Sequence, residues 1–223
     1  MKPVIDSLLR IVLFAILLTV WWLVMHASFS GVMNLSIIVG GMLLTFPLVW
    51  IGRKILDRRQ TISHAVLITT FVHFGLGFAF GIPIVLVLNT HQNWPDLVLP
   101  VPTVIGFILV LITGTVTFLT VANLALKGLG APFFIKLSQK LATDWMYAWT
   151  RNPMVLSVLL FALSLGIWFQ STMFVLWVLI LFAPALLFFV KVFEERELEL
   201  RFGASYLEYK SKTPMLFPRK PRN

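Results

Sequence analysis

Long apolar runs constrain the fold of this chain more than any other feature of its sequence. Six such runs occupy residues 11–26, 32–51, 62–88, 103–126, 154–169 and 172–190. Most of them are about long enough to cross the hydrocarbon core of a bilayer. A sequence that is 59% hydrophobic and only 12% charged does not bury such runs in a water-soluble core. The sequence therefore predicts an all-α integral membrane protein with six transmembrane helices.

The basic residues predict how these helices are oriented. If the N-terminus lies inside, all 18 Lys and Arg residues fall on the same side of the membrane. The three loops on the opposite side contain no Lys or Arg and one acidic residue, Asp96. Because cytoplasmic loops are enriched in Lys and Arg, we expect both termini in the cytoplasm. We expect a multi-pass protein of the plasma membrane, which is the inner membrane if the source is bacterial.

The composition also argues against several kinds of function. The chain has no Cys, which excludes disulfides, thiolate metal sites and Cys nucleophiles. The apolar runs contain no Asp, Glu, Lys or Arg, which argues against a relay of protons or ions through the bilayer. His73 lies deep within one run, and it either packs through a hydrogen bond, binds a substrate head group or carries a proton. The spacing of the four His residues predicts no metal site, and cations clustered at helix ends argue against nucleic acid binding.

The chain is expected to have two functional parts. Residues 1–60 form a two-helix membrane hairpin that serves as a scaffold or binds a membrane-protein partner. Three glycines would let helices approach closely in this hairpin: Gly31, Gly40 and Gly41. Residues 61–223 form a membrane domain whose polar sequence is concentrated in a cytoplasmic connector, 127–153, and a tail, 191–223. We therefore expect any functional site in the connector and the tail.

The last two apolar runs predict a helical hairpin with its turn near residue 170. Residues equally far from the turn of an antiparallel pair lie at equal depth, so Arg151 is expected opposite residue 190 and near Glu194 and Glu195. The fifth run is short, because sixteen residues rise about 24 Å against a hydrocarbon core of about 30 Å. Either the basic end of this run is drawn below the headgroups or the bilayer thins around it.

The second helix of the hairpin is expected to continue beyond the lipid. We expect it to end at Gly203, since glycine commonly follows the last turn of a helix. Glu197 and Arg201 are four residues apart and are expected to pair along this extension. Pro184 is expected to kink the buried part of the helix.

Each polar feature near the predicted site has an ordinary explanation when it is taken alone. Arg151 is a helix-end anchor at the lipid surface, the acidic residues after 193 form a solvated helix face, and "GLG" at 128–130 is a loop after a helix. Together they supply a cation for a carboxylate, acids for an ammonium and ribose hydroxyls, and glycines for close backbone approach. Four aromatic residues can stack on a base or face a sulfonium: Tyr147, Trp149, Tyr206 and Tyr209. This set of groups suits S-adenosylmethionine.

Four motifs follow one another in the second half of the chain. They are "GLGAPF" (128–133), "YAWTRNPM" (147–154), "EERELELRFGASYLEY" (194–209) and a closing Pro after "MLF". Their order resembles the isoprenylcysteine carboxyl methyltransferase and phospholipid methyltransferase superfamily. The family pattern runs Gly-x-Gly, then Arg-His/Asn-Pro-Met-Tyr, then Glu-Glu, then Phe-Gly-x-x-Tyr. The resemblance covers about residues 120–220.

The resemblance implies a membrane-embedded S-adenosylmethionine-dependent methyltransferase. Its cofactor enters from the cytosol, and a lipid-like or prenylated acceptor reaches it from the bilayer. Carried over by position, the cofactor-binding residues are Gly128, Gly130, Tyr147, Arg151, Asn152, Pro153, Glu194, Glu195, Tyr206 and Tyr209. Arg151 and Glu194 are the implied catalytic residues, and Arg151 faces either the cofactor or the head group of the methyl acceptor.

The chain departs from the family pattern beside the charged motif. Trp145 and Met146 stand where Gly-Pro is usual, Val155 replaces the Tyr after Arg-Asn-Pro-Met, and Ser157 replaces a Gly. Ala131 stands where Thr is common. These changes rebuild the wall of the predicted pocket, so they leave open which acceptor is used and whether the site is catalytic.

Two other functions are compatible with the sequence. A membrane reductase of the sterol type would hold NADPH at a comparable face, and "KSK" (210–212) and "PRKPR" (218–222) would then bind its 2′-phosphate. Such a basic tail also suits anionic lipid. A non-catalytic subunit would retain the fold and bind a partner through residues 1–60, and the departures near Tyr147 favour this alternative.

Overall fold

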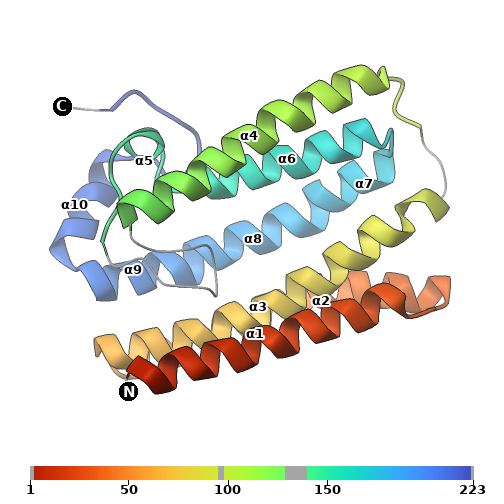
Figure 1. Cartoon of the computed structure of the whole chain (residues 1–223). Coiled ribbons are helices and arrows are strands. Elements are labelled where there is room, and N and C mark those ends of the chain that lie inside the picture. Colours follow the sequence, from red (N-terminus) through yellow and green to blue (C-terminus); the bar gives the residue numbers. More distant parts are fainter. Residues whose placement is uncertain (1–2, 95–97, 129–139, 222–223) are drawn as a thin grey trace. The chain divides into compact units, whose positions relative to one another are not determined.

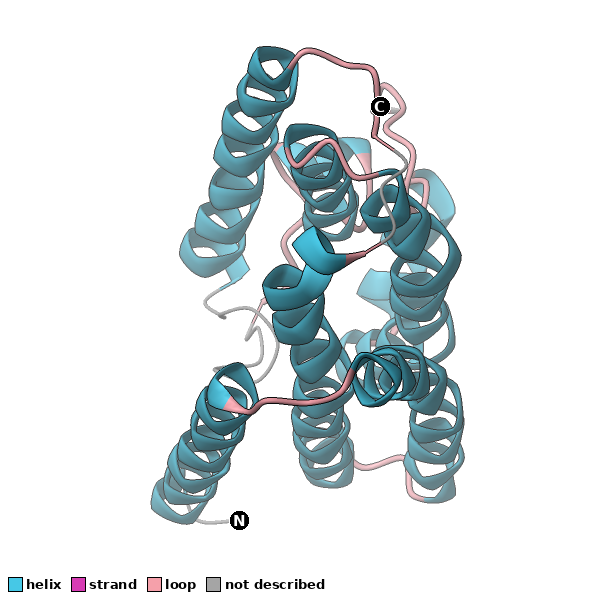
Figure 2. Cartoon of the chain, turned by 90° about the vertical axis from the view of Figure 1, so that its right-hand side faces the viewer, coloured by secondary structure: helices cyan, strands magenta, loops and turns pink. Residues whose placement is uncertain are grey.

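The computed structural model describes residues 3–94, 98–128 and 140–221. These residues form helices joined by loops, without a strand, as Figure 2 shows. The helices are α1 (Pro3–His26), α2 (Gly31–Arg58), α3 (Ile62–Thr90), the 3-10 helix η1 (His91–Asn93), α4 (Thr103–Gly128), α5 (Met146–Trp149), α6 (Pro153–Trp168), α7 (Thr172–Trp177), the π-helix η2 (Val178–Phe182), α8 (Ala183–Phe189), the π-helix η3 (Val190–Glu194), α9 (Glu195–Phe202) and α10 (Ala204–Lys212).

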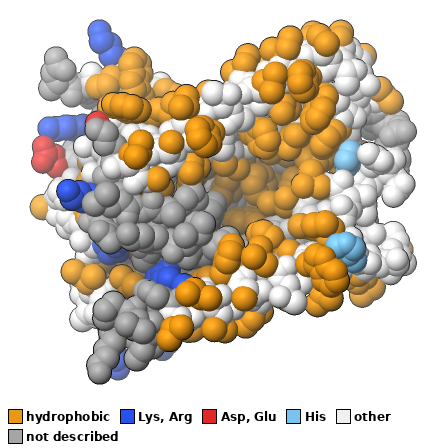
Figure 3. All heavy atoms as spheres, viewed as in Figure 1, with side chains coloured by type: hydrophobic (Ala, Val, Ile, Leu, Met, Phe, Trp, Pro, Cys, Tyr) orange, Lys and Arg blue, Asp and Glu red, His pale blue; other side chains and the backbone are white. Residues whose placement is uncertain are grey.

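Five helical segments are long and apolar enough to cross a membrane. They occupy Leu8–His26, Gly31–Arg58, Ile62–Asn93, Thr103–Leu126 and Thr172–Phe202. Hydrophobic side chains cover much of the surface seen in Figure 3, as expected for helices that face lipid. The all-helical fold is therefore confirmed for the described residues, and five of the six predicted spans are long and apolar enough to cross a membrane. The remaining one, α6, has 16 residues and is shorter than the other five, as the sequence indicated.

The described chain divides into two compact units. The first contains Met1–Trp94 and Pro184–Arg201, and the second contains Pro95–Ala183 and Phe202–Asn223. The long helix that begins at α7 and ends with α9 therefore contributes to both units. The predicted functional division at residue 60 stays a prediction.

In the first unit, α2 packs against α3, which also contacts α1. A Cβ atom on Gly41 would lie 2.6 Å from Cγ of Pro83, so the approach of α2 to α3 at this point depends on the missing side chain. Gly31 and Gly40 have no described atom near the position of a Cβ. Of the three glycines expected to permit close approach, only Gly41 does so within the described chain.

The end of α2 is tied to η3 and α9 in the same unit. Arg53 donates from Nη1 to the carbonyl of Val192 at 2.8 Å. Asp57 accepts from Arg53 and, at 2.9 Å, from Nε of Arg196. Hydrogen bonds to charged groups are stronger than neutral ones, so this network fixes where the C-terminal part of the long helix lies on α2.

In the second unit, α4 and α6 run antiparallel and side by side (Figure 1). Two pairs of hydroxyl oxygens, each 3.3 Å apart, join them: Thr113 with Ser164, and Thr120 with Ser157. A step of seven residues along α4 thus matches a step of seven back along α6. Near the other end, a Cβ on Gly106 would lie 2.5 Å from the backbone of Trp168, so the two helices touch there through main-chain atoms.

The long helix from Thr172 to Phe202 contains two π-helical segments. One of them, η2, ends two residues before Pro184. Proline cannot donate to the carbonyl four residues earlier and its ring collides with that carbonyl, and a π-turn gives the ring room. The helix ends where the sequence predicted, because Gly203 has φ +55 and ends the last turn. The predicted pair also forms, with Arg201 donating to Glu197 at 2.8 Å.

Candidate functional site

The motif "YAWTRNPM" forms a tight bend between two helices of the second unit. The short helix α5 ends at Trp149, and Pro153 is the first residue of α6, where its missing N–H removes no helical hydrogen bond. Trp145 precedes α5 with φ 53 and ψ −121, a conformation that favours glycine. The bend leaves Thr150, Arg151 and Asn152 outside regular helix, so their backbone and side chains are available to bind another segment.

The segment that they bind is the C-terminal strap, which we define as residues 213–219. Arg151 donates its backbone N–H to the carbonyl of Pro214 at 2.9 Å. The carbonyl of Met215 accepts from Oγ1 of Thr150 at 3.1 Å and from Nδ2 of Asn152 at 2.9 Å. The backbone N–H of Arg219 returns to the carbonyl of Trp149 at 3.0 Å. The strap is therefore an integral wall of the predicted site.

The guanidinium of Arg151 also holds the end of α10. Its Nη1 donates to the carbonyl of Lys210 at 2.9 Å and to the carbonyl of Thr213. These carbonyls are at the C-terminus of α10, where the helix dipole favours a cation. Arg151 thus has a structural role that the sequence did not predict, besides the predicted anchoring and cofactor-binding roles.

The three tyrosines of the chain gather around the same bend. Tyr209 donates from its hydroxyl to the carbonyl of Tyr147 at 2.6 Å, and its ring lies 6.2 Å from that of Tyr206. All three side chains are buried. Burial raises the pKa of the Tyr209 phenol, although the nearby Arg151 charge partly opposes this shift. A buried phenol that donates to a carbonyl stays protonated near neutral pH, so Tyr209 is not the base of a reaction at this site.

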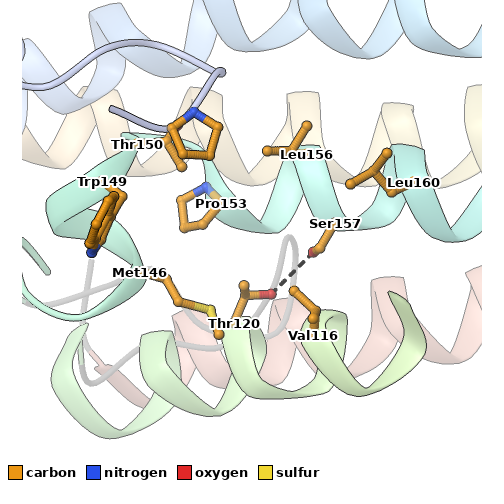
Figure 4. A pocket seen from close by; sticks show the side chains of 10 residues that line it. Val116, Thr120, Met146, Trp149, Thr150, Pro153, Leu156, Ser157 and Leu160 are labelled. Atoms are coloured by element: carbon orange, nitrogen blue, oxygen red, sulfur yellow. Dashed lines mark hydrogen bonds between the residues drawn. The ribbon is translucent and has the colours of Figure 1, made fainter. Parts of the chain in front are cut away.

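A cavity of about 240 Å³ lies beside this bend, between α4 and α6 (Figure 4). Its lining residues are mostly apolar: Val116, Thr120, Met146, Trp149, Thr150, Pro153, Leu156, Ser157, Leu160 and Pro218. Pro218 brings the strap into this wall. The volume falls just below the range of about 300–1,000 Å³ for small-molecule sites, so the cavity suits one part of a lipid-like molecule. Val116 and Leu160 at its edge are exposed on helices of the membrane region.

A family comparison covers this part of the chain. Residues 101–205 match phospholipid methyltransferases. The match covers just under half of the chain. The superfamily resemblance predicted from the motifs is therefore confirmed for the C-terminal half of the chain. No curated protein and no solved structure matches the chain.

The departures from the family pattern divide into two kinds in the structure. Met146 and Ser157 line the cavity beside the bend, so they change the surface that an occupant would meet. Val155 is buried and is not part of this lining, and Trp145 is 64% exposed. Two of the four departing positions beside the charged motif therefore line this cavity. Whether they alter a cofactor pocket stays a prediction.

The other predicted site residues lie in different places. Gly128 is the last residue of α4, whereas Gly130 lies outside the described residues. Glu194 and Glu195 lie in the first unit, at the junction of η3 and α9, and Glu195 is buried. Their predicted proximity to Arg151 stays a prediction. Among the described residues, no group of three or more His, Asp or Glu side chains could hold a metal ion.

His73, the ionisable residue deep in a span, lies in α3 of the first unit. It is buried, and its ring meets the ring of Phe189 edge-on at 5.6 Å. This contact agrees with the packing role among the alternatives that the sequence left open.

Two polar residues of α4 were not predicted as part of the site. Thr120 lines the cavity, and its hydroxyl pairs with that of Ser157 (Figure 4). Asn123 is 1% exposed, and neither its Oδ1 nor its Nδ2 has a hydrogen-bond partner in the described structure. The signal was present in the sequence, because Thr113, Thr120 and Asn123 recur on one face of an apolar helix. The predicted site did not include these residues, because they are uncharged and the prediction rested on charged residues and His within the spans.

Proposed function

We propose that the chain is a membrane-embedded S-adenosylmethionine-dependent methyltransferase that acts on a lipid-like or prenylated acceptor. The observation that carries the proposal is the phospholipid methyltransferase match, whose residues also form all of the apolar cavity beside the Arg-Asn-Pro-Met motif except Pro218. The proposed topology has six spans with α6 as the fifth, both termini inside, and the cofactor at the cytoplasmic face. The distribution of all 18 basic residues supports this orientation.

The described residues fit the proposed cofactor in their chemistry. Arg151 supplies a cation beside Asn152 and Pro153 at the start of α6, and the buried amide of Asn123 has hydrogen-bonding capacity that the described chain does not use. Glu194 and Glu195 would bind the ammonium or ribose hydroxyls. When bound, S-adenosylmethionine supplies an activated methyl group, which leaves its sulfur for a nucleophilic atom of the acceptor.

The protein contributes alignment and exclusion of water to such a transfer. Trp149, Met146 and Pro218 form an apolar wall around the space for the acceptor. An acceptor thiolate or carboxylate needs no base, whereas an ammonium group must lose a proton first. Glu194 or Glu195 would then take that proton, since Tyr209 is held protonated.

The binding test uses the detergent-purified full chain with S-adenosylmethionine, its demethylated product S-adenosylhomocysteine, and NADPH. We expect both sulfur compounds to bind and NADPH not to bind. Glu194→Gln is expected to weaken the binding of both sulfur compounds by about tenfold, which is the effect of losing one charge-assisted hydrogen bond. Transfer of a labelled methyl group to a lipid extract then tests turnover.

A variant of Arg151 needs a matched control because this residue also holds α10. Thr150→Val removes a strap hydrogen bond to Met215 without touching the guanidinium. If Arg151 binds the cofactor, Arg151→Lys lowers the affinity for S-adenosylhomocysteine far more than Thr150→Val does. The comparison requires that proteases cut the strap equally slowly in the two variants. If neither sulfur compound binds the wild-type protein, the proposed function is wrong. Binding without methyl transfer to any lipid would favour the non-catalytic alternative.

A further inference from the structure

An orphaned amide lies inside the membrane helix α4. Asn123 is 1% exposed, and it is the one described residue with two side-chain polar atoms, a donor nitrogen and an acceptor oxygen, that are buried without a partner. Each buried polar group without a hydrogen bond destabilises the folded state. Membrane interiors offer no bulk water to replace the missing partner. Such a group is therefore expected to have a partner that the described residues do not supply.

The register of α4 against α6 locates this amide. The hydroxyl pairs Thr113 with Ser164 and Thr120 with Ser157 establish the register. Three residues beyond Thr120, Asn123 is therefore level with about Met154, in the first turn of α6. This level directly follows Asn152 and Pro153 of the family motif. Asn123 is also five residues, or about 7.5 Å, from the end of α4 at Gly128.

A primary amide recognises a particular pattern of groups. Its oxygen accepts and its nitrogen donates side by side, so its best partner has an adjacent donor and acceptor. The carboxylate of S-adenosylmethionine only accepts and its ammonium only donates. The edge of adenine presents an amino donor beside a ring-nitrogen acceptor, and Asn pairs with it through two hydrogen bonds.

We propose that Asn123 binds the adenine edge of the cofactor and thereby selects adenine over other bases. The proposal rests on the proposed function, and it adds a base-reading residue that lies outside the four motifs. Oδ1 of Asn123 accepts from the amino group of adenine, and Nδ2 donates to the ring nitrogen N7. The site then satisfies both orphaned atoms when the cofactor is bound.

The test compares S-adenosylhomocysteine with S-inosylhomocysteine, in which an oxygen replaces the amino group of the base. Dissociation constants are measured on the detergent-purified full chain. The wild-type protein is expected to prefer the adenine compound by about tenfold to a hundredfold. On the same edge the inosine base presents two acceptors, O6 and N7, so one of them faces Oδ1 without a proton between them whichever way the amide is turned. Asn123→Leu is expected to lose most of this preference and to bind the adenine compound more weakly.

Thr113→Val is the matched control. It removes a polar group from the same helix face at the Ser164 level, away from the motif, so it should keep the full preference for adenine. The thermal midpoint of the ligand-free protein is a second readout. Asn123→Leu should leave it unchanged or raise it, because an orphaned amide is replaced by an apolar side chain of similar size.

The outcomes separate this proposal from the proposed function. If the wild-type protein binds neither nucleoside, the methyltransferase assignment itself is wrong. If it binds the adenine compound and Asn123→Leu keeps the same preference, only the role of Asn123 is overturned. A marked loss of thermal stability in ligand-free Asn123→Leu would also overturn it, because the amide would then have a structural partner such as bound water.

Discussion

Trp145 shows how one residue can carry strain at the edge of the site. Its φ of 53 and ψ of −121 belong to a region that non-glycine residues rarely adopt, and the family pattern has glycine at this position. Its side chain is 64% exposed, so little packing offsets the strain. Replacing the family glycine by Trp145 therefore mainly adds strain to the backbone, and it changes the lining of the cavity little.

Trp145→Gly is accordingly expected to stabilise the protein by about 1 kcal/mol, the order of the strain that it removes. The measurement is the thermal midpoint of the purified protein in detergent. Trp145→Ala serves as the control, because it removes the ring but keeps the Cβ atom that causes the strain. Equal effects of the two substitutions would show that the exposed ring, and not the backbone, is responsible.

Tyr209 makes stability depend on pH at the alkaline end. Burial raises the pKa of its phenol above the ordinary value of 10.0. The folded state therefore favours the protonated form, and the stability that this contributes is complete below pH 10.0 and is lost as the pH rises toward the folded-state pKa. Ionisation of the Tyr209 phenol would break its hydrogen bond to the carbonyl of Tyr147.

We expect Tyr209→Phe to lower the free energy of unfolding at pH 7 by about 1 kcal/mol, through the lost hydrogen bond. Above pH 10, the stability of this variant should fall less steeply than that of the wild type. Susceptibility of α10 and the strap to proteolysis, followed from pH 7 to pH 11, measures both effects. A wild-type decline as shallow as that of Tyr209→Phe would contradict the assignment.

At the scale of helices, α4 and α6 show what holds the site in place. The hydroxyl pairs contribute little each, since interhelical hydrogen bonds in membranes average about 0.6 kcal/mol. The stronger constraint is at Gly106, where a Cβ would lie 2.5 Å from main-chain atoms of Trp168, which cannot rotate away. Gly114, in the same helix, would meet only a carbon of the Phe161 ring, at 3.3 Å.

Gly106→Ala should therefore separate the two helices and lower stability by about 1–3 kcal/mol, the cost of forcing an extra methyl group into a packed contact. Gly114→Ala should cost much less, because a side chain can shift. The comparison is made by thermal unfolding in detergent, with binding of S-adenosylhomocysteine as a second measurement. Equal destabilisation by the two substitutions would contradict the close main-chain contact.

The sequence predicted elements of this fold better than contacts between them. Apolar run length located the membrane helices, and the glycine signal located the end of the long helix at Gly203. The strap was missed because backbone carbonyls such as that of Met215 have no side-chain signature. The role of Arg151 at the end of α10 was missed for the same reason, because its partners there are backbone carbonyl oxygens, which every residue possesses. Asn123 could have been found, since an amide in an apolar helix is costly.

At the scale of the whole molecule, the number of spans depends on α6. Its 16 residues rise about 24 Å, less than a hydrocarbon core of about 30 Å. If α6 crosses the bilayer, the turn at Gln170 lies outside and both termini lie inside. If it does not, the turn stays within the membrane, and the segments before α6 and after α9 still lie on the inside, in agreement with their basic residues.

The absence of cysteine makes this topology directly measurable, because any introduced thiol is the only one in the chain. We expect Asn93→Cys and Gln170→Cys to react with a membrane-impermeant maleimide in intact cells. Lys140→Cys and Ser211→Cys should react only after the membrane is permeabilised. Labelling of Ser211→Cys in intact cells would overturn the inside position of the C-terminus. Protection of Gln170→Cys from the reagent, with Asn93→Cys labelled, would show that α6 and α7 form a hairpin that does not reach the outer surface.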